Sequence, residues 1–308
     1  MKRFHPENIF IFIASAIWII SSICGCGKKE PEKPQETQEF LEEVGVAEIA
    51  KASKDAEKDI KLSGLGEEQK ILSFDMTGYS KDGKKKWSIQ GKSADIISDT
   101  VMLNDIEANA YSGDRTVVLK AQSGSYDKEK HSVRLEDNVV VTTSDGVTLS
   151  AEWLKWESET DTIKTDSFVE VEKDNLYASG NGASANTKQK DVQLNNNILV
   201  RQDDVNVSCD GPLTIDYGNN KASFYGNVKV TEPRGELTAD RLDIFFNPDS
   251  RKIEQIVAER NVELKQGQNT AKGQKIVYIL ASGEAILTGN PEILIYSKKE
   301  LKDAFTGN

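Results

Sequence analysis

The segment Tyr225-Gly226-Asn227-Val228-Lys229-Val230 contains the two features that shape this chain. Val228 and Val230 alternate with Lys229, which predicts a β-strand with one sheltered apolar face and one solvated face. Gly226 and Asn227 directly precede the alternation and tolerate a left-handed or bulged backbone, and a bulge re-aims every side chain after it. The segment therefore predicts a long strand that bends near its middle.

The same mark recurs along more than half of the sequence. An Asn followed by an apolar residue occurs at Asn138-Val139, Asn197-Ile198, Asn227-Val228 and Asn261-Val262, with Phe168-Val169 filling the gap and Asn290-Pro291 closing the series. The successive intervals are 30, 29, 30, 34 and 29 residues. Such regular spacing indicates one supersecondary unit repeated along the chain, each unit stacked on the last.

A second apolar segment, such as residues 147–154 or 235–242, lies between successive marks, so each repeat is two long strands. Turn signals separate the strands at Lys81-Asp82-Gly83, Ser144-Asp145-Gly146, Asn195-Asn196-Asn197 and Gly218-Asn219-Asn220. A bend at the same place in every strand predicts an all-β fold, an elongated antiparallel sheet folded lengthwise into an open-ended trough. The alternative is a closed β-sandwich in which the Asn-Val pairs are ordinary hairpin punctuation.

Composition agrees with an elongated stack. The chain has 308 residues, of which 37% are hydrophobic and 29% are charged. A stack needs less core per residue than a compact globule, because each layer touches only its neighbours. The net charge of −11 argues against a nucleic-acid partner, since phosphate binding depends on clustered Lys and Arg.

Residues 1–26 have the properties of a targeting segment. Lys2 and Arg3 precede an apolar run over residues 9–20 that only Ser15 interrupts. The sequence Ile23-Cys24-Gly25-Cys26 then resembles a bacterial lipoprotein signal-peptidase site, which predicts lipidation of Cys26. The alternative is an uncleaved membrane anchor ending near Cys26. Residues 27–69 follow as a polar, Pro-containing linker with a possible short helix.

An enzyme is not expected. The chain has two histidines, His5 in the leader and His131 in a charged turn, so His-based catalytic or metal sites cannot be assembled. Cys209 is the only cysteine beyond the leader and is expected to fill space in a strand. No metal and no cofactor is predicted.

Two stretches resemble a known family. Residues 73–79, followed by Asp82-Gly83 and Trp87, resemble the opening of LptC-type lipopolysaccharide export proteins. Residues 121–127, Gly226-Asn227-Val228 and residues 237–242 are similar to the repeated "A-x-x-x-x-Y-D", "G-N-V" and "A-D-x-L" words of the LptA/OstA family. The resemblance implies an LptC-like β domain at 70–202 continuous with an LptA-like β domain at 203–308.

The resemblance also implies an apolar interior that carries lipopolysaccharide between an inner-membrane ABC transporter and the outer membrane. The residues expected to line it follow the repeat marks: Val139, Val141, Val169, Val171, Ile198, Val200, Val228, Val230, Val262 and Leu264. The implied partners are the acyl chains of lipopolysaccharide, the ABC transporter, and LptA/LptD-like proteins that add to the sheet edge. The implied location is the periplasm, with the N-terminus tethered to the inner membrane rather than the outer.

The competing interpretation is a structural or adhesin-like surface lipoprotein. In such a protein the chain's own side chains would fill the trough and no lipid would bind. The state of the interior, open or filled, therefore separates the two functions.

Overall fold

The computed structural model describes residues 69–296, apart from residues 80–82, 113–114, 131, 158, 161, 187–188, 190 and 251. The contacts divide the chain into two compact units, whose described parts are an N-terminal unit (residues 69–195 with 216–218) and a C-terminal unit (residues 196–215 and 219–296). The boundary falls inside one strand, β9 (Asp191–Gln202). The predicted leader with Cys26 and the predicted linker up to residue 68 lie outside the described residues.

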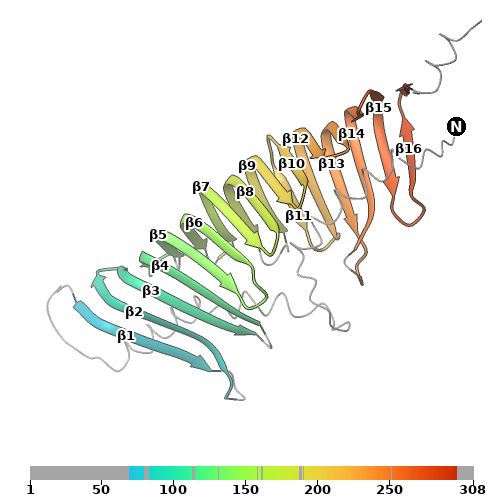
Figure 1. Ribbon diagram of the computed structural model, residues 1–308. Coiled ribbons are helices and arrows are strands. Elements are labelled where there is room, and N and C mark those ends of the chain that lie inside the picture. Colours follow the sequence, from blue (N-terminus) through green and yellow to red (C-terminus); the bar gives the residue numbers. More distant parts are fainter. Residues whose placement is uncertain are drawn as a thin grey trace, which may run out of the picture. The chain divides into compact units, whose positions relative to one another are not determined.

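The N-terminal unit is an antiparallel arrangement of long strands (Figure 1). Its strands are β1 (Gln69–Tyr79), β2 (Lys85–Ile97), β3 (Thr100–Ser112), β4 (Arg115–Asp127), β5 (Ser132–Thr143), β6 (Thr148–Glu157), β7 (Thr162–Lys173), β8 (Leu176–Asn186) and the first part of β9. Each strand from β1 to β7 pairs with the next one along the chain. The order is thus a meander, with each strand beside its neighbour in sequence.

The C-terminal unit continues the same pattern. After the second part of β9 come β10 (Val205–Cys209), β11 (Leu213–Asp216), β12 (Lys221–Glu232), β13 (Gly235–Phe246), β14 (Ile253–Gln266), β15 (Asn269–Ile279), β16 (Glu284–Thr288) and β17 (Glu292–Leu294). Strand β10 pairs with both β9 and β12, and β12 to β15 pair in succession. Strands β16 and β17 pair with opposite halves of β15. The predicted all-β, antiparallel fold is confirmed.

The predicted bends are present at mid-strand. Asp137 and Asn138 in β5 have φ of 63° and 58°, and Gly226 and Asn227 in β12 have φ of 75° and 47°. The pairing register shifts at the same places, between Glu136 and Val139 against β6 and between Tyr225 and Val228 against β13. These residue types adopt a left-handed backbone at little cost, so the strand can bend there without breaking.

Two of the four predicted turn signals mark turns and one was wrong, while Lys81 and Asp82 of the fourth lie outside the described residues. Ser144-Asp145-Gly146 and Gly218-Asn219-Asn220 lie in turns, and the amide of Gly146 donates to the carbonyl of Thr143 over 2.9 Å. Asn195-Asn196-Asn197 instead lies inside β9, where Asn197 has φ of 52°. A left-handed Asn suits a strand bend as well as a turn, so the residue type alone did not separate the two.

Residues on both sides of a bend share one core. In β3, Leu103 and Ile106 are both buried, although a straight strand would place them on opposite faces. Asp105 between them has φ of 48°, and this left-handed residue restores the inward direction. Leu103 and Ile106 belong to one cluster with Trp87, Ile89, Ala94, Ala121 and Val139. The two halves of a long, bent strand such as β3 therefore belong to two walls that face a common interior.

Candidate functional site

The interior of the bent sheet is the surface that the sequence predicted as functional. Along each half of a strand every second side chain points inward. At the bend this two-residue spacing is interrupted, and it resumes on the other side. In β12 the buried inward residues are Ala222 and Phe224 before the bend and Val228 and Val230 after it. The interior face is apolar because both halves place their hydrophobic residues on the same side.

The predicted lining residues separate into two groups by exposure. In the N-terminal unit Val139 and Val169 are buried at 0% and 1% exposure, whereas Val141 and Val171, two positions further along, are partly exposed. In the C-terminal unit every predicted residue is buried: Ile198, Val200, Val228, Val230, Val262 and Leu264. The interior is therefore partly accessible in the N-terminal unit at these positions and filled at the corresponding positions of the C-terminal unit.

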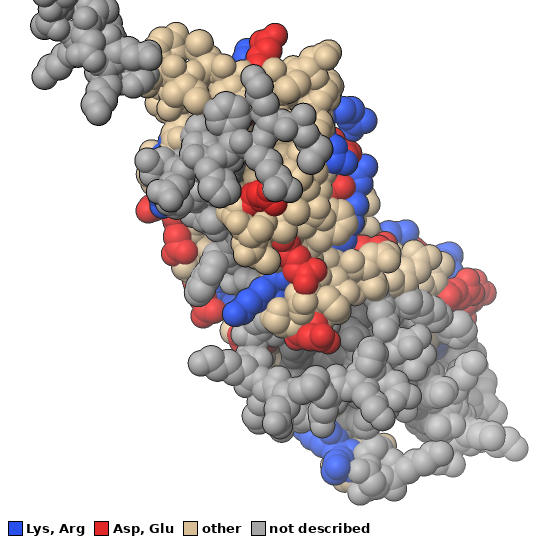
Figure 2. All heavy atoms as spheres, turned by 90° about the vertical axis from the view of Figure 1, so that its right-hand side faces the viewer, with Lys and Arg blue, Asp and Glu red and all other residues tan. Residues whose placement is uncertain are grey.

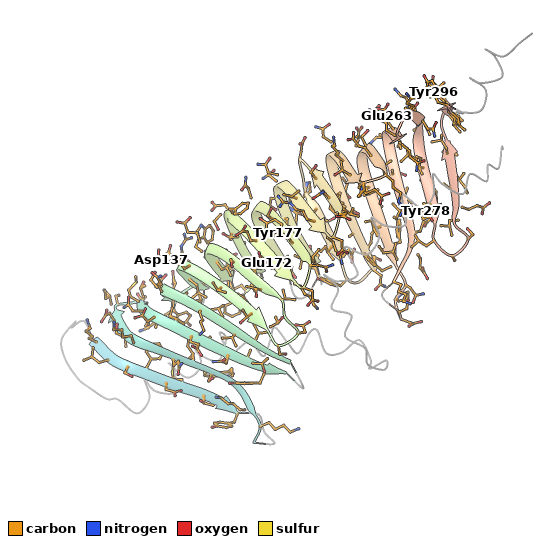
Figure 3. All side chains as sticks on the ribbon, in the orientation of Figure 1. Asp137, Glu172, Tyr177, Glu263, Tyr278 and Tyr296 are labelled. Atoms are coloured by element: carbon orange, nitrogen blue, oxygen red, sulfur yellow. The ribbon has the colours of Figure 1, made fainter. Side chains whose placement is uncertain are left out.

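Inward residues that the sequence argument did not name strengthen this contrast. Phe74, Met76, Val101, Leu135 and Leu154 in the N-terminal unit pack against the cluster around Trp87 yet remain only partly buried. In the C-terminal unit, Phe224, Phe246 and Tyr278 are buried, with Phe224 at 0% exposure. Figure 3 places Tyr278 on β15, and its burial raises the pKa of its hydroxyl.

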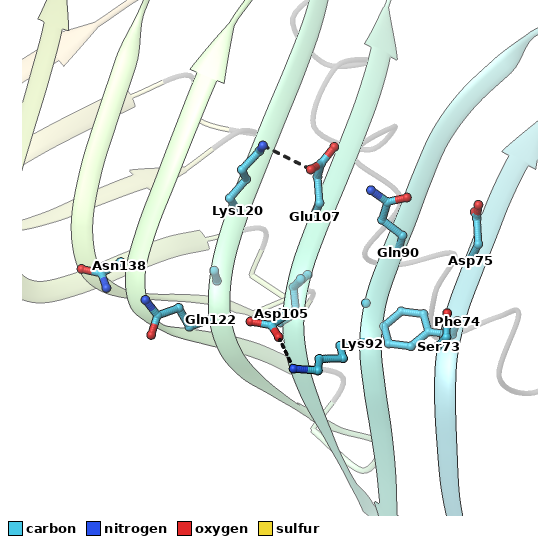
Figure 4. Close-up of a pocket in the computed structure, with 13 residues that line it drawn as sticks. Ser73, Phe74, Asp75, Gln90, Lys92, Asp105, Glu107, Lys120, Gln122 and Asn138 are labelled. Atoms are coloured by element: carbon cyan, nitrogen blue, oxygen red, sulfur yellow. Dashed lines mark ion pairs between the residues drawn. The ribbon is translucent and has the colours of Figure 1, made fainter.

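A hollow lies on the N-terminal unit. It has a volume of about 600 Å³ and is lined at the bends of β1 to β5 (Figure 4). Two ion pairs cross it, Lys120 Nζ to Glu107 Oε2 at 3.2 Å and Lys92 Nζ to Asp105 Oδ2 at 3.6 Å. The charged residues of these pairs are largely exposed, whereas Phe74, Ile106 and Ala121, which also line the hollow, belong to or pack against the apolar cluster around Trp87. The hollow is therefore the place where the apolar interior meets solvent.

The outward faces carry paired charges rather than a patch of one sign. Lys229 lies 2.6 Å from Glu236, and Lys275 lies 2.7 Å from Glu259. Figure 2 shows acidic and basic side chains interspersed on the face in view. Exposed pairs of this kind contribute little to stability, so they make the surface soluble without defining a charged binding site.

One outward charge cluster is buried. Asp243 on β13 is 5% exposed and accepts Arg241 Nε at 3.0 Å, with Lys221 Nζ at 3.1 Å. Burial acts to raise the pKa of its carboxyl, but hydrogen bonds from Ser223, Arg241 and Lys221 outweigh burial and lower the pKa below its ordinary value. Arg241 also lies over the ring of Tyr225, 5.0 Å from its centroid. This cluster holds β12 and β13 together and is structural.

Two family models match the chain, and they meet near the boundary at residues 202–203 that the resemblance implied. Residues 67–203 match the family of LptC-related lipopolysaccharide-assembly proteins. Residues 212–308 match the family described as LptA/(LptD N-terminal domain) LPS transport protein. The chain joins an LptC-like part to an LptA-like part. Its parts are thus those of lipopolysaccharide assembly and transport proteins.

The LptC-like part ends just after β9, and the LptA-like part begins one residue before β11. A solved structure similar to the chain is that of LptH, the LptA homologous periplasmic component of the conserved lipopolysaccharide transport device from Pseudomonas aeruginosa. The two are 13% identical, the match covers 40% of this chain and 95% of LptH, and the TM-score is 0.33. No curated protein matches this chain.

The sequence predicted no catalytic residue. Cys209, which lies between the two matched parts, is a buried thiol. Burial raises its pKa to about 11, so it is protonated at neutral pH and a poor nucleophile. Across the described residues, no three Asp, Glu, His or Cys side chains gather as a metal site. The described part of the LptC-like and LptA-like chain also has no helix long and apolar enough to cross a membrane.

Proposed function

We propose that this chain is a periplasmic, membrane-tethered conduit that carries lipopolysaccharide from the inner-membrane ABC transporter toward the outer membrane. The observation that carries the proposal is the apolar interior between the two walls, with partly exposed residues such as Val171 and Leu154 in the N-terminal unit. The matches to an assembly family and a transport family support it.

The energetic reason for such an interior is the cost of moving acyl chains through water. Each methylene gains about 0.8 kcal/mol on burial, so a chain of about a dozen carbons loses roughly 10 kcal/mol of favourable burial in water. An apolar surface that follows the whole path removes this barrier. The predicted lining residues lie in both units, Val139, Val141, Val169 and Val171 in the first and the other six in the second, which fits a path along each sheet.

The proposed organisation follows the sequence. Residues 1–26 form a lipoprotein signal with Cys26 as the acylated residue, residues 27–69 form a linker, residues 70–202 the LptC-like domain and residues 203–308 the LptA-like domain. The tether holds the chain at the inner membrane. We place LptC and LptA functions in one polypeptide.

Edge strands supply the proposed docking sites for the transporter and for LptA/LptD-like partners. Leu72 and Tyr79 on β1 are 74% and 65% exposed, and Leu294 and Tyr296 at the last strand are 52% and 56% exposed. Figure 3 shows Tyr296 near the end of the last strand. Exposed apolar side chains beside a strand edge suit a partner that adds a strand of its own, since backbone hydrogen bonds then supply affinity.

A structural lipoprotein is the second candidate, because one observation favours it. The C-terminal interior is filled by its own side chains, with Val228 and Val262 each at 2% exposure. A conduit requires these side chains to yield to a lipid, whereas a scaffold requires them to stay packed.

Depletion of the chain in its own cells distinguishes the two. A conduit predicts that newly made lipopolysaccharide accumulates in the inner membrane, measured by separating the membranes after pulse labelling. Re-expression of the wild-type chain reverses the accumulation. A Cys26→Ser chain, which lacks the tether, reverses it only in part. An unchanged distribution of lipopolysaccharide after depletion favours the scaffold.

A further inference from the structure

Glycine occupies inward positions that do not require its backbone freedom. Gly78 on β1 and Gly91 on β2 lie inside strands and do not have left-handed φ, unlike Gly226 and Gly289 at φ of 75°. A residue with a side chain could adopt this backbone without strain. Something other than conformation therefore explains why a glycine stands at these two places.

The explanation is an aromatic ring from the neighbouring strand. Gly78 pairs directly with Trp87, and Phe74 pairs directly with Gly91. A Cβ added at Gly78 would lie 2.1 Å from Nε1 and 2.3 Å from Cε2 of Trp87. A Cβ added at Gly91 would lie 2.5 Å from Cε1 and Cζ of Phe74. Atoms of each ring thus occupy the space that a Cβ on the glycine of the adjacent strand would take.

The position of these rings sets how much of the interior remains free at this end of the N-terminal unit. A ring that lies flat on the sheet adds one van der Waals layer, about 3.5 Å. A ring lifted by a side chain beneath it would project into the interior. Phe74 and Met76, the inward residues of β1 next to Gly78 and Gly91, are only partly buried, so apolar surface is accessible there.

In the C-terminal unit a glycine is crowded by an aliphatic side chain that is not its direct partner, since Leu287 pairs with Ile276. A Cβ at Gly273 on β15 would lie 2.6 Å from Cδ1 of Leu287 on β16. Gly273 also has the carbonyl oxygen of Thr288 at 2.9 Å from that position, so a substitution there would disturb the backbone as well. At Gly78 the three nearest atoms all belong to the Trp87 side chain, so Gly78 is the better place for a test.

We propose that Gly78 and Gly91 are positioning residues that seat the rings of Trp87 and Phe74 against the sheet and so keep the β1–β2 end of the interior wide enough for acyl chains. This inference rests on the proposed lipid-conduit function and names the residues that set its width at the first strand pair. The alternative role is purely structural, an aromatic ring that covers an edge glycine and stabilises the sheet.

The test uses the full-length chain in membranes with lipopolysaccharide, and a small diazirine amino acid at Met76 reports lipid contact. We expect Gly78→Ala to lower the yield of lipid adduct at Met76 about ten-fold. An extra methyl that overpacks the interior should weaken lipid binding by about this factor. A second probe at Val171, in the same unit, should change less than about two-fold. Thr77→Ala, on the same strand between the inward residues, is the matched control and should leave both adducts unchanged.

A compensating variant separates width from stability. In Gly78→Ala/Trp87→Leu the smaller side chain no longer collides with the new methyl, and we expect the adduct at Met76 to return. An undiminished Met76 adduct in Gly78→Ala overturns the inference, as does an equal loss at Met76 and Val171 that Trp87→Leu does not restore. Absence of any adduct at Met76 and Val171 in the wild-type chain overturns the conduit function together with this inference.

Discussion

The two units share one construction and differ in how their interiors are filled. In the N-terminal unit, inward residues such as Val141 and Val171 keep part of their surface exposed, and many of the buried side chains are alanines. In the C-terminal unit the equivalent Val230 and Leu264 are buried, together with large residues such as Phe224. Bent strands therefore enclose either a partly open or a closed interior, depending on the size of the side chains between the walls.

The difference separates two tasks that one interior has to perform. A filled interior is stabilised by dispersion and by the apolar area it removes from water. A partly exposed interior gives up some of that stability and offers apolar surface to a ligand. On the proposed function, the N-terminal unit can accept an acyl chain at once, whereas the C-terminal unit exchanges its own packing for lipid.

The largest expected effect is on the core of the C-terminal unit. Phe224→Ala should lower the free energy of unfolding of that unit by about 3–5 kcal/mol, because it leaves a large cavity at a fully buried site. Phe74→Ala, at a partly exposed site in the N-terminal unit, should cost about 1–2 kcal/mol. Hydrogen exchange in each unit, followed by mass spectrometry, measures the two effects separately. Equal losses would remove the energetic contrast between the units.

The buried charge cluster predicts the next effect. Asp243→Asn should destabilise the C-terminal unit by about 2–3 kcal/mol, because Arg241 and Lys221 lose a buried partner. Glu263→Gln is the control, since Glu263 pairs with Lys265 and Lys272 on the surface and should cost under about 1 kcal/mol. Urea unfolding of the two variants gives the comparison, and similar midpoints for both would show that burial of Asp243 adds nothing.

The bends differ in their backbone, which predicts a smaller effect. Asn261 in β14 has φ of 51°, so Asn261→Val should cost roughly 1–2 kcal/mol by forcing a β-branched residue into left-handed backbone. Asn261→Gly keeps the backbone and should lose only the hydrogen bonds of the amide to Asp240. In the N-terminal unit, β7 bends at Phe168 without a left-handed residue, and Phe168→Val should be close to neutral. Thermal unfolding monitored by circular dichroism ranks the three.

The smallest expected effect is the loss of the stability contributed by Asp243 at low pH. The pKa of Asp243 is lowered from its ordinary value of 3.8, so its ionised form stabilises the folded state. This stability is fully present above 3.8 and is lost as the pH falls through the lower, folded pKa. Urea midpoints of wild type and Asp243→Asn should therefore converge in strong acid. A constant gap between them at every pH would contradict this account.

The sequence predicted the features that depend on local residue type. Asn-Val marks and alternation located the bends and the inward residues, because left-handed tolerance and strand periodicity act within a few residues. It did not predict which inward residues stay exposed, since that depends on the side chains of neighbouring strands and of the opposite wall. Val139 and Val141 look alike in sequence, yet only Val139 is fully buried.

Cross-strand register explains what else was missed. The seat of Trp87 on Gly78 requires those two residues to be direct partners, which no local pattern reveals. The hollow needs Gln90 opposite Glu107 and Glu107 opposite Lys120. The turn predicted at residues 195–197 became a bend because β9 continues through it. Pairing, rather than residue type, decides all three.

The most direct test of the account is lipid contact along the two interiors. A photo-crosslinking amino acid is placed in the full chain at inward Val171 or Val230, or at the outward neighbours Glu172 and Lys229, and the chain is illuminated in cells that make lipopolysaccharide. The account predicts lipopolysaccharide adducts at Val171 and Val230 and none at Glu172 and Lys229. Equal labelling of inward and outward positions, or no adduct at either inward position, would contradict a lipid path through the folded sheet.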